Sequence, residues 1–257
     1  MRPGSLKQKI NNGETTIGSW ITLGHPAIAE IMLRAGYDWL VVDLEHSTIS
    51  IEQAGELIRT IDLGGSAPLV RITSNSPDQV KRVMDAGAHG IIVPMVNSAQ
   101  DARNAVAATR YAPQGNRGVG LARAQGYGPK FSEYLEWQKE SAIVIVQIEH
   151  KDAISNLEEI LAVPGVDGFI IGPYDLSCSM GIPGEFEKSE FKDAMGRILN
   201  IGLAMGCPAG LHIVEPDVSR LEQAISEGYR FIAYSVDVRM LDVSARQGID
   251  TIRGINK

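Results

Sequence analysis

Apolar runs alternate along this chain with segments that carry a helical spacing of hydrophobic residues. Eight of the runs are rich in Val, Ile, Leu and Ala, which is typical of parallel strands that are covered on both faces. The predicted strands are residues 17–23, 39–43, 68–72, 90–94, 143–148, 168–171, 209–213 and 231–234.

Segments of helical periodicity lie between these strands. Apolar residues recur there at i, i+3, i+4 and i+7, which places them on one buried face of a helix. The predicted helices are residues 27–35, 51–61, 77–86, 99–109, 153–161, 188–205, 216–227 and 238–254.

Glycines close several of the predicted helices. Gly36, Gly87 and Gly228 each follow a helical segment and precede a strand, as a left-handed C-cap does. A βα unit repeated about eight times predicts an α/β fold in which residues 1–257 form one (β/α)8 TIM barrel, a fold of about 250 residues. The alternative is a doubly wound open sheet, but no glycine-rich dinucleotide turn follows the first strand.

Composition excludes several classes of protein. A net charge of −7 argues against a nucleic-acid surface. Cys178 and Cys207 are too few for a disulfide framework and fit a reducing compartment. Residues 1–12 lack the apolar core of a signal peptide, and no apolar run approaches the length of a membrane span. We therefore expect a cytoplasmic protein.

One long segment interrupts the βα rhythm. Residues 111–128 are rich in glycine, carry a net positive charge and lie between the fourth predicted helix and the fifth strand. A loop of this length in a compact domain is usually functional or a contact between subunits. The alternative is a mobile excursion, and the sequence does not decide between the two.

Charged and polar residues cluster where the predicted strands end. In a barrel, the carboxyl ends of the strands form one rim, which carries the active site. Neighbouring candidates are about one βα unit apart, so they would meet at this rim. The candidates are Glu45, His46, Arg71, Gln147, Glu149, Asp175 and His212.

Glu149 and Asp175 are candidate metal ligands. Two carboxylates from adjacent strands, completed by water and substrate, suit Mg²⁺ or Mn²⁺ better than zinc. The alternative is that both carboxylates pair with Arg or Lys at the rim.

His46 and Arg71 are candidate catalytic groups. An imidazole titrates near neutral pH and can act as a general base. The alternative is that His46 lies near the start of a helix and forms a hydrogen bond with Ser47 or Thr48. Arg71 can bind a carboxylate or stabilise an oxyanion, unless it forms a salt bridge with Asp43 or Glu45. Together with a metal, these groups would support enolisation next to a keto acid.

The chain also resembles a known family along nearly its whole length, from Gly18 to beyond Val236. The segments that carry the resemblance are residues 36–46, 70–71, 93–96, 110–120, 147–149 and 165–177, which include Asp-Leu-Glu-His, Gln-Ile-Glu and Gly-Pro-Tyr-Asp. They are similar to those of the class II, metal-dependent pyruvate aldolases. That family cleaves 4-hydroxy-2-oxoheptanedioate, 2-keto-3-deoxy-rhamnonate and 2-dehydro-3-deoxyglucarate, each to pyruvate and an aldehyde.

The resemblance implies a role for each matching residue. Glu149 and Asp175 would hold Mg²⁺, Mn²⁺ or possible Co²⁺, and Gln147 with the backbone of Tyr174 would seat the 2-oxo acid. Arg71 would stabilise the enolate, and His46 would deprotonate the 4-hydroxyl. Asp85 would raise the basicity of His46. The predicted helix, however, places Asp85 near its C-terminal end. From there it could reach His46 only by an unusual path or from another subunit, and the alternative is that it has a purely structural partner.

Other implied properties concern the substrate and the assembly. Tyr174 replaces a smaller residue of many relatives, and His25 and His212 differ from the sugar-acid members, so the acceptor aldehyde stays open. The family is typically a homohexamer, a trimer of dimers that exchange the last helix, here residues 238–254. Its long loop approaches a neighbouring site, to which Arg123 could contribute.

Three other functions remain open at this point. Oxaloacetate decarboxylation and citrate-lyase-like cleavage of a CoA thioester use the same enolate chemistry, although this acidic chain has no obvious basic groove for the phosphates of CoA. A catalytically silent barrel with a binding role is the alternative from another class.

Overall fold

Eight parallel strands close into one barrel in the computed structural model, which describes residues 5–254. Each strand pairs with the next, and β8 pairs with β1, so the barrel has no free edge. This confirms the (β/α)8 prediction and shows that the open sheet was wrong. The strands are β1 (Thr16–Ile21), β2 (Trp39–Asp43), β3 (Ala67–Arg71), β4 (Gly90–Val93), β5 (Ile143–Ile148), β6 (Gly168–Ile171), β7 (Ala209–Ile213) and β8 (Phe231–Val236).

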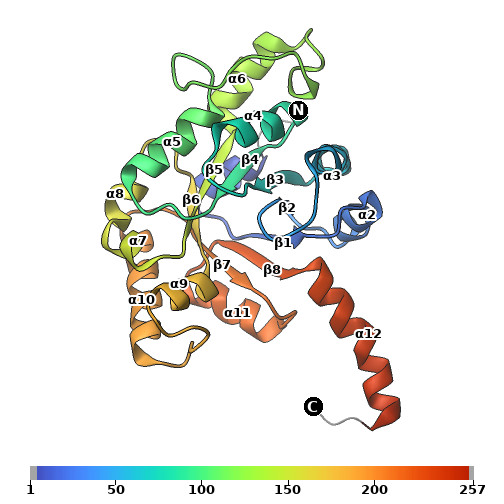
Figure 1. The fold of residues 1–257 in the computed structure, drawn as a ribbon, viewed down its shortest axis with the longest axis vertical. Coiled ribbons are helices and arrows are strands. Elements are labelled where there is room, and N and C mark those ends of the chain that lie inside the picture. The colour runs from blue at the N-terminus through green and yellow to red at the C-terminus, as the bar shows by residue number, and fades with distance from the viewer. Residues whose placement is uncertain (1–4, 255–257) are drawn as a thin grey trace.

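Helices surround this barrel on its outside (Figure 1). The first described helix precedes β1, and a 3-10 turn, η1 (Arg123–Gln125), lies in the long segment before β5. The helices are α1 (Ser5–Asn11), α2 (Pro26–Arg34), α3 (Ile51–Gly64), α4 (Pro77–Ala86), α5 (Ala99–Thr109), α6 (Phe131–Ser141), α7 (Lys151–Ser155), α8 (Leu157–Leu161), α9 (Pro173–Ser179), α10 (Ser189–Ala204), α11 (Val218–Glu227) and α12 (Asp237–Arg253).

The sequence pattern missed α1, α6 and α9. The buried face of α6 includes Gln138 and Ser141, so its apolar period is weak. The single helix predicted for residues 153–161 is two short helices, α7 and α8, that meet at Asn156. The remaining predicted elements are present, with ends that differ from the prediction by a few residues.

The inside of the barrel follows a period of two along each strand. On β2, Trp39 and Val41 face a mostly apolar interior, and Asp43 continues the same row. Trp39 stacks on Phe231 of β8 with ring centroids 4.1 Å apart and planes within 2°. A Cβ on Gly18 would lie 2.0 Å from the Trp39 ring, so this stack requires glycine at position 18.

Helix α1 closes the amino-terminal end of the barrel. Leu6 and Ile10 are buried in the same apolar cluster as Trp39. Lys7 forms an ion pair with Asp167, which lies just before β6. The amino-terminal end is therefore apolar within and sealed by a helix.

The central part of the segment between α5 and α6 packs against the helices outside the barrel. Arg117 is buried, with its guanidinium 4.4 Å from the Tyr111 ring centroid and 5.2 Å from that of Tyr134. It also pairs with Asp85 of α4 at 3.0 Å. These contacts hold the central part of the segment against α4 and α6. Apolar side chains on the outer part of the segment are exposed, namely Val119, Leu121 and Tyr127.

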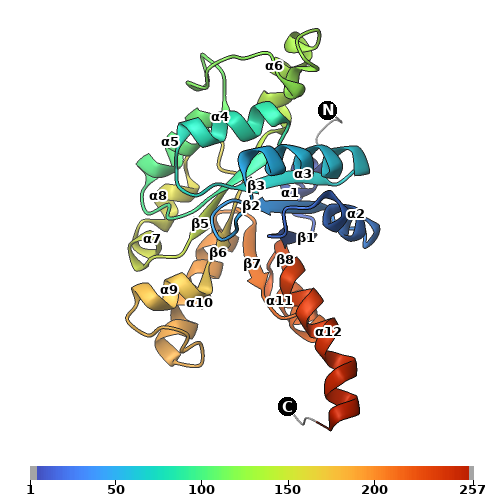
Figure 2. The ribbon, with the colours of Figure 1, turned by 45° about the vertical axis from the view of Figure 1, so that its right-hand side comes forward.

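Helix α12 extends away from the barrel toward the C-terminus (Figure 1, Figure 2). Its exposed apolar side chains include Leu241, Ile249 and Ile252. Arg239, near its start, pairs with Glu215 at 2.8 Å and so connects α12 to the loop after β7. No helix within residues 5–254 is long and apolar enough to cross a membrane.

Candidate active site

The inward-facing rows of the strands change from apolar to charged at their carboxyl ends. Asp43 ends β2 opposite Arg71 of β3, and Gln147 lies on β5, two residues before Glu149. Asp175 lies in the first turn of α9, directly after β6. The structure therefore brings the predicted strand-end residues to one rim, as the βα spacing indicated.

Arg71 is held in place by three groups. Its Nε donates to Oδ1 of Asp43 at 2.8 Å, and its Nη2 donates to Oδ2 at 2.6 Å. Nε also lies 3.4 Å from Oε2 of Glu45, and the guanidinium stacks 4.4 Å above the Trp20 ring. The salt bridges that we named as the alternative to catalysis are thus present. They also fix the direction of the guanidinium, as a group that stabilises an oxyanion requires.

Asp43 organises the turn that carries His46. Its Oδ1 accepts the backbone N–H groups of Glu45 and His46 at 3.0 and 3.3 Å. Ser47 donates its hydroxyl to the Asp43 carbonyl oxygen, so it does not satisfy the imidazole as we had considered. The His46 side chain is 63% exposed, and its Nε2 lies 3.7 Å from Oε2 of Glu45. An exposed imidazole next to an acid is open to substrate.

Glu149 is only 3% exposed and is held from two sides. Its Oε1 accepts the backbone N–H of Met95 at 2.7 Å, and its Oε2 accepts Nε2 of Gln147. Met95 adopts a φ of 53°, a left-handed conformation that is costly for a residue with a side chain and that directs this N–H. A Cβ on Gly172 would lie 2.7 Å from Oε2, so glycine there leaves room for the carboxylate.

The rim contains more negative than positive charge. Burial raises the pKa of Glu149, and Asp175 raises it further. Burial also raises the pKa of Glu45 to about 7, against the opposing effect of Arg71 and with the support of Glu149, Asp43 and Asp175. A divalent cation would relieve this crowding of carboxylates.

Two buried oxygen atoms at the rim also lack a hydrogen-bond donor. They are Oε1 of Gln147 and Oε2 of Glu45, the latter lying within ion-pair distance of Arg71 Nε at 3.4 Å but making no hydrogen bond to it. Hard oxygen atoms are the donors that Mg²⁺ and Mn²⁺ prefer. Within residues 5–254, no group of three or more His, Cys, Asp or Glu side chains is arranged to hold a metal. The residues fit a cation bound by few protein carboxylates, with further ligands from water or substrate.

Other predicted residues lie outside this group. Asp85 is bonded to Arg117, and Arg123 pairs with Asp62 and reaches the Ala86 carbonyl oxygen, so neither contacts His46 within the chain. His25 caps α2, since its Nδ1 accepts the backbone N–H of Ala27 at 3.2 Å. These three have local structural partners.

His212 and Tyr174 border the rim. The His212 ring lies 5.4 Å from the Trp20 ring, and burial lowers the pKa of His212 to about 4. Tyr174 is the second residue of α9, next to Asp175, and is 56% exposed.

Sequence reasoning did not identify Trp20, Met95 or Gly172 as parts of the site. The period of two along β1 could have indicated Trp20, because it faces inward near the end of the strand. No local sequence pattern predicts the positive φ of Met95 or the close approach of Gly172 to Glu149.

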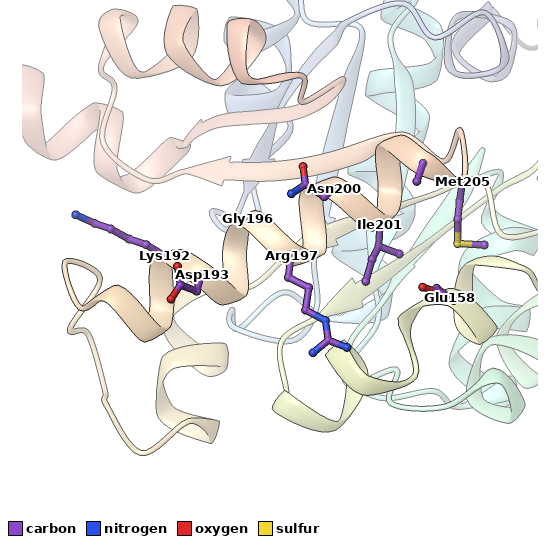
Figure 3. Close-up of a pocket in the computed structure, with 9 residues that line it drawn as sticks. Glu158, Lys192, Asp193, Gly196, Arg197, Asn200, Ile201 and Met205 are labelled. Carbon is purple, nitrogen blue, oxygen red and sulfur yellow. The ribbon is translucent and has the colours of Figure 1, made fainter.

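A second hollow lies on the helical exterior (Figure 3). It is a groove of about 650 Å³ between α8 and α10, and its charged side chains carry both signs. Figure 3 shows that the side chains of Arg197 and Lys192 point in different directions. The groove shares none of the rim residues and is not part of the candidate site.

Comparisons with known proteins agree with this geometry. The family model described as HpcH/HpaI aldolase/citrate lyase matches residues 16–242. The chain is 37% identical over 237 residues to the 2-keto-3-deoxy-L-rhamnonate aldolase of Escherichia coli O9:H4 (strain HS), covering 91% of this chain and 88% of that one.

Solved structures show the same similarity. An HpcH/HpaI aldolase/citrate lyase family protein from Burkholderia cenocepacia J2315 superposes with a TM-score of 0.91 at 35% identity, covering 97% of this chain and 99% of that one. The HpcH/HpaI aldolase from Desulfitobacterium hafniense DCB-2 gives 0.89 at 30% identity, covering 98% and 97%.

Proposed function

The chain belongs to the HpcH/HpaI aldolase/citrate lyase family and is an aldolase, and on this premise we propose that it cleaves a 4-hydroxy-2-oxo acid reversibly to pyruvate and an aldehyde. The observation that carries the proposal is the joint placement of Arg71, Glu149 and Asp43 at the rim, in fixed hydrogen bonds. A positively charged group lies there beside a carboxylate-lined position that suits a cation.

Glu149 and Asp175 are the proposed ligands of a divalent metal. Mg²⁺ or Mn²⁺, with Co²⁺ as a further candidate, would act there as a Lewis acid that polarises the bound substrate. Gln147 and the backbone of Tyr174 seat the same end of the substrate. The buried, unpartnered Oε1 of Gln147 supports this role, because a buried amide oxygen is rarely left without a partner.

Arg71 stabilises the negative charge that develops on the keto oxygen when the carbon–carbon bond breaks. Its two bonds to Asp43 hold the guanidinium before substrate arrives, so little reorganisation is needed during the reaction. His46 removes the proton from the 4-hydroxyl in cleavage and returns it in the reverse direction. Its exposure and its position next to Glu45 support this assignment.

Assembly of several copies is part of the proposal. The exposed apolar residues of α12 support a homohexamer, a trimer of dimers in which α12 packs against a second copy. In such an assembly, the long segment with Arg123 would approach a neighbouring rim, and Asp85 would act on His46 of a second copy. Substituting Leu241→Asp and Ile249→Asp should reduce the sedimenting mass, whereas an unchanged mass contradicts helix exchange.

A cytoplasmic location is also part of the proposal, and cysteine usage supports it. Cys178 and Cys207 are both free, and Cys178 is exposed, which suits the cytoplasm.

Metal removal tests the central claim. Enzyme treated with a chelator and dialysed should lose condensation of pyruvate with an aldehyde, and Mg²⁺ or Mn²⁺ should restore it while circular dichroism stays constant. Equal activity with and without metal would contradict the proposed function.

A further inference from the structure

A pocket of about 410 Å³ adjoins the rim on the side of β6 and β7. Tyr174, next to Asp175, lines this pocket and borders the rim, and so does His212, whose ring is tilted against that of Trp20 with centroids 5.4 Å apart. The pocket therefore borders the candidate site at these two residues. Its remaining walls come from the segment after α9, from α10, from β7 and the loop after it, and from α11.

Aromatic side chains form one wall of the pocket. Tyr174 and Phe186 meet edge to face with ring centroids 4.9 Å apart, and Phe186 lies 5.2 Å from Phe191. Phe191 is buried and anchors this row, while Tyr174 is exposed at its outer end. Met195 of α10 adds a flexible apolar surface beside it.

Charged side chains around the pocket already have partners within the chain. Glu215 pairs with Arg239 at 2.8 Å, and Arg220 pairs with Glu227 at 3.1 Å. Asp217 accepts the first N–H groups of α11 and acts as its N-cap.

The His212 side chain in the wall is neutral near pH 7, since burial lowers its pKa to about 4. A substrate carboxylate placed in this pocket would have to compete with Glu227 for the Arg220 guanidinium. The surface that stays available is aromatic and aliphatic.

We propose that this pocket receives the substituent of the aldehyde and selects uncharged aldehydes with an aromatic or apolar substituent over aldehydes that carry a carboxylate. The proposal rests on the proposed aldolase function. In condensation, the methyl carbon of pyruvate loses a proton and bonds to the aldehyde carbon, and the aldehyde oxygen gains a proton. The equation therefore balances without another reactant. The substituent does not react, so its binding energy appears as specificity.

Three aldehydes test this selection with pyruvate as the donor: benzaldehyde, succinic semialdehyde and acetaldehyde. Benzaldehyde fills an apolar pocket, succinic semialdehyde brings a carboxylate, and acetaldehyde leaves the pocket empty. The expected result for the wild-type enzyme is a kcat/KM for benzaldehyde about tenfold above that for succinic semialdehyde. The reverse order would overturn the proposal.

Phe186→Ala removes the centre of the aromatic wall. It should lower kcat/KM for benzaldehyde about tenfold while acetaldehyde stays near the wild-type value. Leu63→Ala is the matched control, because Leu63 is an exposed apolar residue on α3, outside this pocket. An equal loss for benzaldehyde and acetaldehyde, or no loss, contradicts a substituent pocket at Phe186.

Deuterium exchange at the pyruvate methyl separates this proposal from the function on which it rests. Exchange needs no aldehyde, so Phe186→Ala should exchange at the wild-type rate. If wild-type enzyme with Mg²⁺ or Mn²⁺ shows no exchange, the aldolase function fails rather than the pocket. If Phe186→Ala loses exchange while the wild-type enzyme keeps it, Phe186→Leu, which keeps most of the side-chain volume, is tested instead. The same two criteria then apply, a lower kcat/KM for benzaldehyde and an unchanged value for acetaldehyde.

Arg220→Gln tests the rival substrate class. If Arg220 exchanges Glu227 for a substrate carboxylate, this variant will lose activity toward succinic semialdehyde alone, and the selection proposed here is wrong. Unchanged ratios among the three aldehydes support it.

Discussion

The two ends of this barrel use the same strands in opposite ways. At the amino-terminal end, Trp39 stacks on Phe231 and α1 seals an apolar interior. At the carboxyl end, the same inward-facing rows continue as Asp43, Arg71 and Glu149, and the carboxyl pKa values of Glu45 and Glu149 are raised. One end contributes stability through burial, whereas the other holds charges that repel one another in the metal-free protein. We therefore expect that substitutions at opposite ends of a single strand change the stability of the fold and the activity of the site separately.

The largest expected effect comes from Glu149→Ala at the carboxyl end. Turnover should fall about a thousandfold, because a metal that polarises the substrate lowers the barrier by several kcal/mol. The thermal midpoint should stay close to the wild-type value, since the lost side chain is a buried carboxylate with a raised pKa. Steady-state kinetics and calorimetry measure the two quantities.

The control for Glu149→Ala is Glu158→Ala, in the groove between α8 and α10. It should change neither quantity. A large loss of stability in Glu149→Ala with turnover retained would reverse the division between the two ends.

Phe231→Ala tests the amino-terminal end. Removing a fully buried ring that stacks on Trp39 should lower the free energy of unfolding by about 3 kcal/mol. The folded fraction should keep the wild-type KM for pyruvate, because the carboxyl rim is untouched. Urea unfolding and kinetics below the transition measure both, and a raised KM would show that the two ends are coupled.

Glu45 predicts a pH dependence of stability at the carboxyl end. Its pKa rises from 4.5 to about 7 on folding, so the native protein keeps a proton that the unfolded chain loses. This contribution to stability is complete below pH 4.5 and is lost as the pH rises through 7. Above pH 7, the Glu45→Gln variant treated with a chelator should therefore be more stable than wild-type protein treated in the same way. The gain should be about 1 kcal/mol, because the side chain is partly exposed and solvent weakens the effect.

Unfolding in urea at pH 5 and pH 8 measures this difference, with Glu52→Gln on the exposed side of α3 as control. A Glu45→Gln advantage that is the same at both pH values would show that Glu45 does not retain a proton.

Met95→Gly should change stability by a similarly small amount and leave metal affinity unchanged. Glycine adopts the observed φ of 53° without strain, so stability should rise by about 1 kcal/mol, while the N–H that binds Glu149 remains. Met95→Ala keeps the strain and should show no such gain. Calorimetric titration with Mn²⁺ should give equal affinities for Met95→Gly and the wild type. A weaker affinity would show that the Met95 side chain also holds the site.

Much of the fold could be predicted from local patterns. Buried parallel strands are apolar at nearly every position, and Gly87 and Gly228 mark helix ends in the left-handed conformation. The α6 helix could not be found in this way, because Gln138 on its buried side accepts the N–H of Tyr111 instead of packing as an apolar residue. The formation of such a helix depends on contacts between residues that are far apart in the sequence, which a local pattern does not contain.

The site was predictable to the extent that βα spacing places residues on one rim. Arg71 and Glu149 follow from that spacing. Their orientation does not, since it depends on Asp43, on the backbone of Met95 and on the absence of a side chain at Gly172. The role of Asp85 stays a prediction, because the partner that it has within the chain is Arg117.

The pairing of β1 with β8 also has a consequence for synthesis. Thr16 of β1 is paired with Phe231, so the first strand leaves the ribosome more than 200 residues before the strand that completes its hydrogen bonds. Until then, the edge of β1 and the nearby ring of Trp39 have no final partner. The nascent chain therefore carries an open strand edge for most of its elongation, which is the period when chaperones protect such edges from other chains.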